Sequence, residues 1–402
     1  MDNCLKIGLT ARISAPELYP VSVGGAMIHQ RGGDVCIIGG TMFLNAGIGV
    51  SALRCAEDRS VLPCKVEVAW FSFTEKRAFY AEFEVDDRYV SKVVKEGFEL
   101  VNGLRGCYTY FDIALFPAGR VAFYLSGDER MTLVGLHRAK ETDLPVSVFA
   151  PDAGFEDYDE FAEAFISGDE CIDDSFENGF EDGSECDDFR QENFEPEDFE
   201  PGDFADDDMW RDDMVEKNRA DVAKAPWIVN LTENGVDYAM IERLFERHSY
   251  EMIVEGVSAG NMAEPVFSVE FANGEFCKFK GDKMPYGNYG IVKSVSLEHE
   301  SDGGTVLYDI YFDLSELAEA FRTSTCNSSF VGKSGDNNNI ADNSRADKQQ
   351  NRLILNFDDI GYTVSVKFAY MSGCRNIEKI RYRVAEYNGR RTALKGGNFD
   401  IG

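Results

Sequence analysis

The chain has 402 residues, with 72 Asp and Glu against 40 Lys and Arg, and a net charge of −32 at pH 7. This excess of acidic residues argues against a nucleic-acid-binding protein, because nucleic-acid phosphates would be repelled. The sequence has neither a run of about 18 apolar residues, as a transmembrane helix needs, nor an apolar signal segment near Met1, so we expect a cytoplasmic protein.

Residues 1–148 predict an α+β domain. Polar and apolar side chains alternate over two stretches beyond residue 64, which is the pattern of half-buried strands. The next segment has apolar residues at helical spacing, with an acidic cap before it and glycines after it. Two further strands flank the turn Pro117-Ala118-Gly119, which is typical of a hairpin. The expected elements are strands at 65–71, 78–85, 108–116 and 120–125 and a helix from Asp86 or Asp87 to Gly97.

Residues 149–222 are expected to form a disordered acidic linker. Within them, residues 151–210 hold 25 acidic side chains and one basic side chain, Arg190, and so carry three quarters of the net charge. Phe recurs every five residues in part of this tract, a period that matches neither helix nor strand. We therefore expect an extended, solvated segment whose aromatic side chains can dock on a partner. The candidate partner-binding residues are Phe189, Phe194, Phe199, Phe204, Asp206, Asp207, Asp208 and Trp210.

Residues 223–402 predict a second α+β domain that repeats the first. Its strands are expected at 293–297, 305–312, 353–357 and 362–368, with a helix at 313–321 and a disordered polar insertion at 326–351. Several features recur in the same order, and matching them pairs Lys65 with Lys293, Tyr80 with Tyr308, Cys36 with Cys277 and Gly119 with Gly361. This order favours an internal duplication. The alternative is that two unrelated α+β domains share generic hairpin patterning.

The predicted fold class is therefore α+β. Two related, mainly antiparallel sheet domains, each with one packed helix, are expected to be joined by the disordered acidic linker.

Residues with reactive or ligand-binding chemistry do not form a recognised motif in the sequence. The ten cysteines form no CxxC pair, and without an export signal they are expected to be reduced and mostly buried. His29 and His299 have no partner at metal-binding spacing and read as surface side chains. Gly332-Lys333-Ser334 lacks the upstream glycine of a phosphate-binding loop. No cofactor and no metal are expected, apart from loose Ca²⁺ association with the acidic tract, which stays open.

A succession of motifs in the first domain carries a family resemblance. Leu62-Pro63 is followed by Trp70-Phe71-Ser72, by Phe79-Tyr80 and then by the hairpin Phe116-Pro117-Ala118-Gly119-Arg120-Val121. This order resembles the bacterial domain-of-unknown-function family 2931, well over residues 10–140 and more loosely over 240–395. Ala118 stands where the family has glycine, and Phe71 interrupts the family's tryptophan-serine spacing.

The resemblance implies a fold rather than a catalytic role, because its motifs are turns and strand aromatics. Many members of that family resemble lipoproteins, an anchor that this sequence does not show. Others are encoded near toxin and secretion loci, which implies an immunity role.

The residues and the resemblance together lead to three hypotheses. The first is a non-enzymatic, immunity-like or inhibitor-like protein that binds a basic protein partner, with no nucleic-acid or membrane partner. The second is a structural or scaffold module in which the acidic tract is only a solubilising spacer. The third is an enzyme with a site between the two domains, which would need a cleft with strongly shifted titratable groups.

Overall fold

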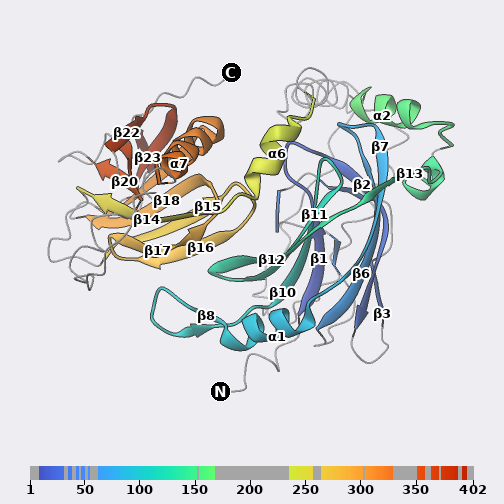
Figure 1. Cartoon of the computed structure of the whole chain (residues 1–402), viewed down its shortest axis with the longest axis horizontal. Helices are drawn as coiled ribbons and strands as arrows, with labels where there is room; N and C mark the ends of the chain where they lie inside the picture. The colour runs from blue at the N-terminus through green and yellow to red at the C-terminus, as the bar shows by residue number, and fades with distance from the viewer. Residues whose placement is uncertain are drawn as a thin grey trace, which may run out of the picture.

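Strands dominate the computed structural model of this chain, and the predicted α+β class is confirmed (Figure 1). No helix in the part of the chain that is described has the length and apolar character needed to cross a membrane. The structure describes residues 9–30, 35–38, 42–44, 47–49, 53–54, 62–151, 154–167, 235–256, 264–301, 304–328, 351–357, 364–370, 373–387 and 392–395.

The first repeat is a sandwich of two sheets with a core between them. Val66, Val68 and Trp70 alternate along one strand and are buried in this core, while Lys65 and Glu67 face outward. The first sheet has the order β13 (Lys140–Thr142), β7 (Arg77–Glu84), β6 (Pro63–Ser72), β2 (Val21–Gln30) and β3 (Val35–Ile38), and β4 (Met42–Leu44) also pairs with β2. The second has the order β12 (Arg130–Arg138), β11 (Arg120–Gly127), β10 (Tyr110–Phe116), β1 (Thr10–Ser14) and β5 (Leu53–Arg54).

Helix α1 (Asp87–Glu96) connects the two sheets of this repeat, as the sequence predicts. The side chain of Asp86 caps it by accepting the N–H of Tyr89, and Gly97 ends it with a φ of 58°. Val90 and Val94 are buried in the same core, one turn apart. A short ladder of β8 (Phe98–Glu99) and β9 (Arg105–Gly106) follows the helix.

The second repeat has the same strand order as the first. Its helix, α7 (Leu314–Ser328), follows β19 (Gly304–Phe312), just as α1 follows the equivalent strand β7. Helix α7 includes the first residues of the insertion expected at 326–351. Residues 329–350 lie outside the described residues. The first sheet has the order β23 (Ile380–Tyr387), β19 (Gly304–Phe312), β18 (Val292–Ser301), β15 (Val266–Phe271) and β16 (Phe276–Lys280), with β24 (Thr392–Lys395) beyond β23. The second has the order β22 (Gly373–Ile377), β21 (Val364–Tyr370), β20 (Arg352–Phe357), β14 (His248–Glu255) and β17 (Lys283–Tyr289).

The shared topology extends to strand direction. In each repeat the second sheet contains one parallel pair, β1 with β10 in the first repeat and β14 with β20 in the second. In each case the second strand of the pair is the first strand of that sheet after the helix. The other strand neighbours within the two sheets of each repeat are antiparallel. Ten strands in one order with one pattern of directions support the expected duplication.

One residue match made from the sequence holds, and another is wrong. Cys36 and Cys277 are both buried in equivalent strands, opposite Ile28 and Val269. Tyr80, however, lies on the outer face of its sheet, whereas Tyr308 is buried in the core of the second repeat. The hairpin β6–β7 closes at Ser72 and Arg77 and the hairpin β18–β19 at Ser301 and Gly304, so the turns differ in length. The sequence match assumed equal spacing along the two hairpins, so it paired Tyr80 with a residue one position away from its structural equivalent. A shift of one residue along a strand places a side chain on the opposite face of the sheet.

The cysteines depart from their predicted state. Cys36 and Cys107 are disulfide-bonded, whereas Cys64, Cys277 and Cys374 are free. The expectation of reduced cysteines is wrong for the first two, because pairing depends on which Cα atoms the fold brings within bonding range and spacing in the sequence does not reveal that.

The two repeats are joined edge to edge. Strand β12 of the first pairs antiparallel with β16 of the second, with Arg130 opposite Cys277 and Met131 opposite Phe276. The result is one 11-stranded sheet that runs through both repeats, and the two strands meet in the middle of Figure 1. Ala114, Phe116 and Tyr124 of the first repeat belong to the core of the second. The repeats are therefore halves of one folded body.

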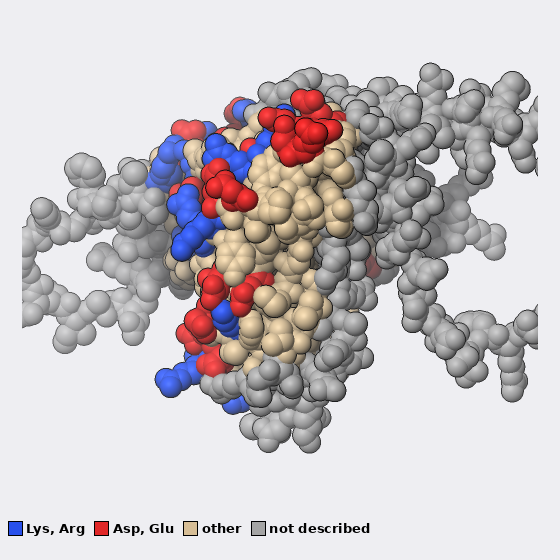
Figure 2. All heavy atoms as spheres, turned by 90° about the vertical axis from the view of Figure 1, so that its right-hand side faces the viewer, with Lys and Arg blue, Asp and Glu red and all other residues tan. Residues whose placement is uncertain are grey.

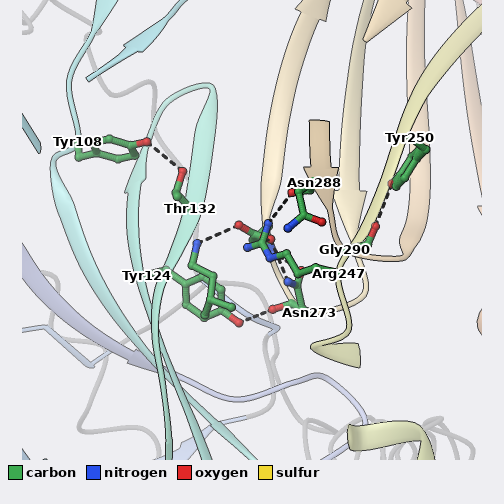
Figure 3. Close-up of polar contacts among 10 residues, drawn as sticks. Tyr108, Tyr124, Thr132, Arg247, Tyr250, Asn273, Asn288 and Gly290 are labelled. Atoms are coloured by element: carbon green, nitrogen blue, oxygen red, sulfur yellow. Dashed lines mark hydrogen bonds and ion pairs between the residues drawn. The ribbon is translucent and has the colours of Figure 1, made fainter. Parts of the chain in front are cut away.

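The turn Asn273-Gly274-Glu275 makes the polar contacts at this junction (Figure 3). The backbone carbonyl of Asn273 accepts a hydrogen bond from the buried Tyr124 hydroxyl. Glu275 Oε1 accepts the N–H of Leu133 on β12 at 3.1 Å, and its Oε2 lies 2.6 Å from Arg247. Gly274 has a φ of 88°, a conformation open to glycine at little cost.

Glu275→Gln is expected to lower the free energy of unfolding by about 2 kcal/mol, because a buried hydrogen-bonded charge is lost and Arg247 keeps no partner charge there. Urea denaturation of the full chain measures this change. Glu270→Gln is the matched control, since that carboxylate pairs with Lys293 at the exposed surface of the same sheet and its loss should cost about 0.5 kcal/mol or less. Equal effects of the two substitutions would contradict the role given to Glu275.

Candidate functional site

The acidic tract is described only near its ends. Phe189, Phe194, Phe199, Phe204, Asp206, Asp207, Asp208 and Trp210 all lie outside the described residues. The described residues on either side of 168–234 form two helices, α2 (Tyr158–Ser167) before it and α6 (Tyr238–Leu244) after it. Both helices contact the first repeat, so the described chain on either side of residues 168–234 has a defined place on the molecule.

Helix α2 packs on the outer face of the first sheet. Phe161 is 4% exposed and lies 5.1 Å, between ring centroids, from both Phe71 and Phe73. Phe165 stacks on Phe73 at 4.0 Å. The 3₁₀ turn η2 (Val146–Val148) and Phe149 complete this small core. The expectation of an extended, solvated tract from residue 151 is therefore wrong for α2, because an aromatic patch on the outside of the sheet receives its apolar side.

Helix α6 lies over the junction of the two repeats (Figure 1). Asp237 caps it by accepting the N–H of Met240 at 3.0 Å. Ile241 and Leu244 are buried in the shared core, and Phe245 contacts Phe116 with a centroid distance of 5.0 Å.

Both helices are tied to one turn of the first repeat, the residues Glu75 and Lys76 between β6 and β7. Lys76 Nζ lies 2.8 Å from Asp159 of α2, and this contact raises the pKa of Lys76. Glu75 Oε1 accepts a hydrogen bond from the hydroxyl of Tyr238 of α6 at 3.1 Å and another from the N–H of Ala118 at 3.0 Å. Adjacent residues of one turn therefore contact the helices on either side of residues 168–234.

A groove of about 600 Å³ borders this turn. Glu75, Arg77, Arg138, Glu141 and Tyr238 are among the side chains that line it. Burial, and then the nearby carboxylate of Glu75, raises the pKa of Tyr238, so its hydroxyl stays protonated as a donor. The mixture of basic and acidic side chains gives the groove no single charge preference.

A second groove, of about 360 Å³, crosses the junction on one face of the long sheet. Arg12 lines it with its guanidinium 3.7 Å from the centroid of Tyr110 and its Nε 2.6 Å from Asp112. Burial raises the pKa of Asp112, and Arg12 opposes that shift. Because Asp112 already neutralises Arg12, the groove is not a free anion site. Three serine hydroxyls that line the groove already donate hydrogen bonds to carboxylates, Ser126 to Asp112, Ser294 to Glu270 and Ser296 to Asp309.

A titratable cluster lies on the outer face of β2, β6 and β7. Glu67 accepts a hydrogen bond from the Tyr80 hydroxyl at 3.0 Å and lies 2.9 Å from His29 and 2.8 Å from Lys65. The contact with Lys65, then that with Tyr80, lowers the pKa of Glu67 to about 2. The sequence predicted a solvated side chain for His29. The alternation of inward and outward side chains along β2, β6 and β7 was the signal that could have placed His29 on the same outer face as Glu67.

The Glu67 contacts stabilise the ionised carboxylate, so their contribution is complete above the ordinary Glu pKa and is lost as the pH falls toward about 2. The melting temperature of the wild type should therefore drop more steeply below pH 5 than that of Glu67→Gln, in scans taken from pH 7 downward. Glu84→Gln, at an exposed position on the same face, should keep the wild-type slope. Identical slopes for wild type and Glu67→Gln would contradict this account.

The other described histidines are packed against rings. His137 stacks on Phe83 and His248 on Phe321, and burial lowers the pKa of both imidazoles. In the described part of the chain, no group of three His, Cys, Asp or Glu side chains could hold a metal ion. The backbone of His299 lies in β18, but its side chain is outside the described set.

Comparison with models of protein families, with curated proteins and with solved structures finds no match for the chain. The resemblance to family 2931 therefore stays a prediction from motifs.

Replacing Phe161 by alanine should detach α2, since losing a buried phenylalanine costs about 3 kcal/mol or more. Hydrogen exchange of the α2 amides should accelerate by about 100-fold. Asp159→Asn removes only the exposed ion pair with Lys76 and should accelerate exchange by less than about fivefold. Unchanged protection of α2 in Phe161→Ala would show that the aromatic contacts do not hold the helix.

Proposed function

We propose that this protein is a non-enzymatic binding protein of the immunity or inhibitor type, and that its acidic tract engages a basic protein partner. The observation that supports the proposal is that the helices on either side of residues 168–234 pack on the same folded body, α2 on the aromatic patch of the first sheet and α6 on the core at the junction. Polar contacts to the adjacent residues Glu75 and Lys76 accompany this packing. A segment with this charge attracts a cationic surface at long range, and its phenylalanines can anchor the complex at short range.

The same attachment counts against the spacer hypothesis. A spacer separates two bodies, but here the repeats share a core and a continuous sheet. The helices on either side of residues 168–234 contact adjacent residues of one turn, and the repeats pair directly, so the distance between the repeats does not depend on the length of the tract. A solubilising effect of the charge remains compatible with either hypothesis, and only binding distinguishes them.

Two variants of the full chain test separately the acidic charge of the tract and its aromatic side chains. In the first, the Asp and Glu residues of 168–210 become Asn and Gln. In the second, Phe189, Phe194, Phe199, Phe204 and Trp210 become Ser while every charge stays. Poly-L-lysine, a cation without specific structure, should bind the wild type and the second variant equally and the first variant at least about tenfold more weakly at low salt.

The partner itself is sought by affinity capture from the cell that makes the protein, with identification by mass spectrometry. A basic protein that is retained by the wild type, lost with each variant and released by rising salt supports the proposal. Retention of the same proteins by wild type and both variants would remove the acidic tract from the binding mechanism.

A further inference from the structure

The junction between the repeats uses two different kinds of sheet edge. Strand β12 is an edge of the second sheet of the first repeat, and β16 is an edge of the first sheet of the second repeat. Because both repeats have the same topology, each of them carries both kinds of edge. One edge of each kind is joined within the chain, which leaves the other two, β22 and β3, to be accounted for.

Strands β22 and β3 end their sheets in the described part of the chain. Strand β22 is last in the order β17-β14-β20-β21-β22, and β3 is last in β13-β7-β6-β2-β3. A sheet edge presents unpaired backbone N–H and C=O groups, which can accept a further strand. In Figure 1, β22 lies at the upper left and β3 at the lower right, toward opposite ends of the long axis.

The structural equivalence of the two repeats determines which residues of β22 and β3 would lie opposite each other. Arg130 lies opposite Gly127 on the neighbouring strand, as Gly373 lies opposite Tyr370, so Met131 corresponds to Cys374. Cys277 lies opposite Val269 as Cys36 lies opposite Ile28, so Phe276 corresponds to Val35. Met131 lies opposite Phe276 at the internal junction. At an equivalent junction between two molecules, Cys374 would therefore lie opposite Val35.

The exposure of these edges fits an interface. Ile37 is 68% exposed and Val35 is 40% exposed on the outer side of β3, and Met27, opposite Ile37, is also 40% exposed. Cys374 and Gly373 are exposed at the start of β22. Figure 2 shows that the side of the molecule that carries β3 has a wide uncharged area beside a band of mixed charge. Soluble proteins protect an edge with charged side chains, and β3 has none.

We propose that β22 of one molecule pairs with β3 of a second copy, in the register of the internal junction between β12 and β16. The contact joins two different surfaces, so the first copy keeps a free β3 edge and the second keeps a free β22 edge, and association continues in a line. The product is an open chain of molecules along the long axis of Figure 1. A closed symmetric dimer would need one surface to meet itself.

Photocrosslinking tests the register. The full-length protein is made with p-benzoylphenylalanine in place of Val35, and in a control in place of Leu307, which is also 40% exposed but lies on a central strand. Irradiation should give a ladder of covalent dimers, trimers and larger species for position 35 only. Mixing ¹⁵N-labelled and unlabelled protein should show that residues 373–377 of another molecule are attached.

A second measurement does not depend on the crosslinker. The mean mass of the wild type in sedimentation equilibrium should rise with concentration, and Ile37→Lys should reduce the association constant by at least about tenfold while leaving the fold intact by circular dichroism. A wild type that stays monomeric up to near-millimolar concentration overturns the proposal. So does crosslinking at position 35 that stops at the dimer or reaches residues outside β22.

Discussion

The backbone pairing between β12 and β16 is the constraint on which the rest of the structure depends. Only two residue pairs form this ladder, yet it makes two sandwiches share a sheet and a core. The turn Asn273-Gly274-Glu275 stabilises this contact by accepting hydrogen bonds from the Tyr124 hydroxyl and the Leu133 amide of the first repeat. Because the repeats are joined in this way, the helices on either side of residues 168–234 both pack on one folded body.

The duplication and the acidic tract are therefore separate features of the molecule. Duplication supplies the scaffold, and its two sheet cores are filled by the alternation of apolar side chains along the strands. The tract is inserted between the repeats in sequence, and the helices on either side of residues 168–234 both contact the turn Glu75-Lys76 of the first repeat. A functional account of the charge has to start from this attachment site.

The strand and helix pattern could be predicted because it follows from local chemistry. Alternation located β6 and β7, the Asp86 cap and Gly97 bounded α1, and the turn around Gly119 marked the hairpin of β10 and β11. The junction could not be predicted in the same way, because edge pairing joins residues far apart in sequence and leaves no periodic signal. For the same reason neither the aromatic patch under α2 nor the disulfide bonds of Cys36 and Cys107 could be read from spacing.

The two strands of the junction lie far apart in the sequence, which matters while the chain is being synthesised. Strand β12 is complete at Arg138, but its partner β16 begins only at Phe276. On the ribosome, the edge of β12 therefore has no partner within its own chain until the intervening residues, which include the most acidic part of the sequence, have been made. An edge that waits for a distant partner is a place where identical nascent chains can misassemble.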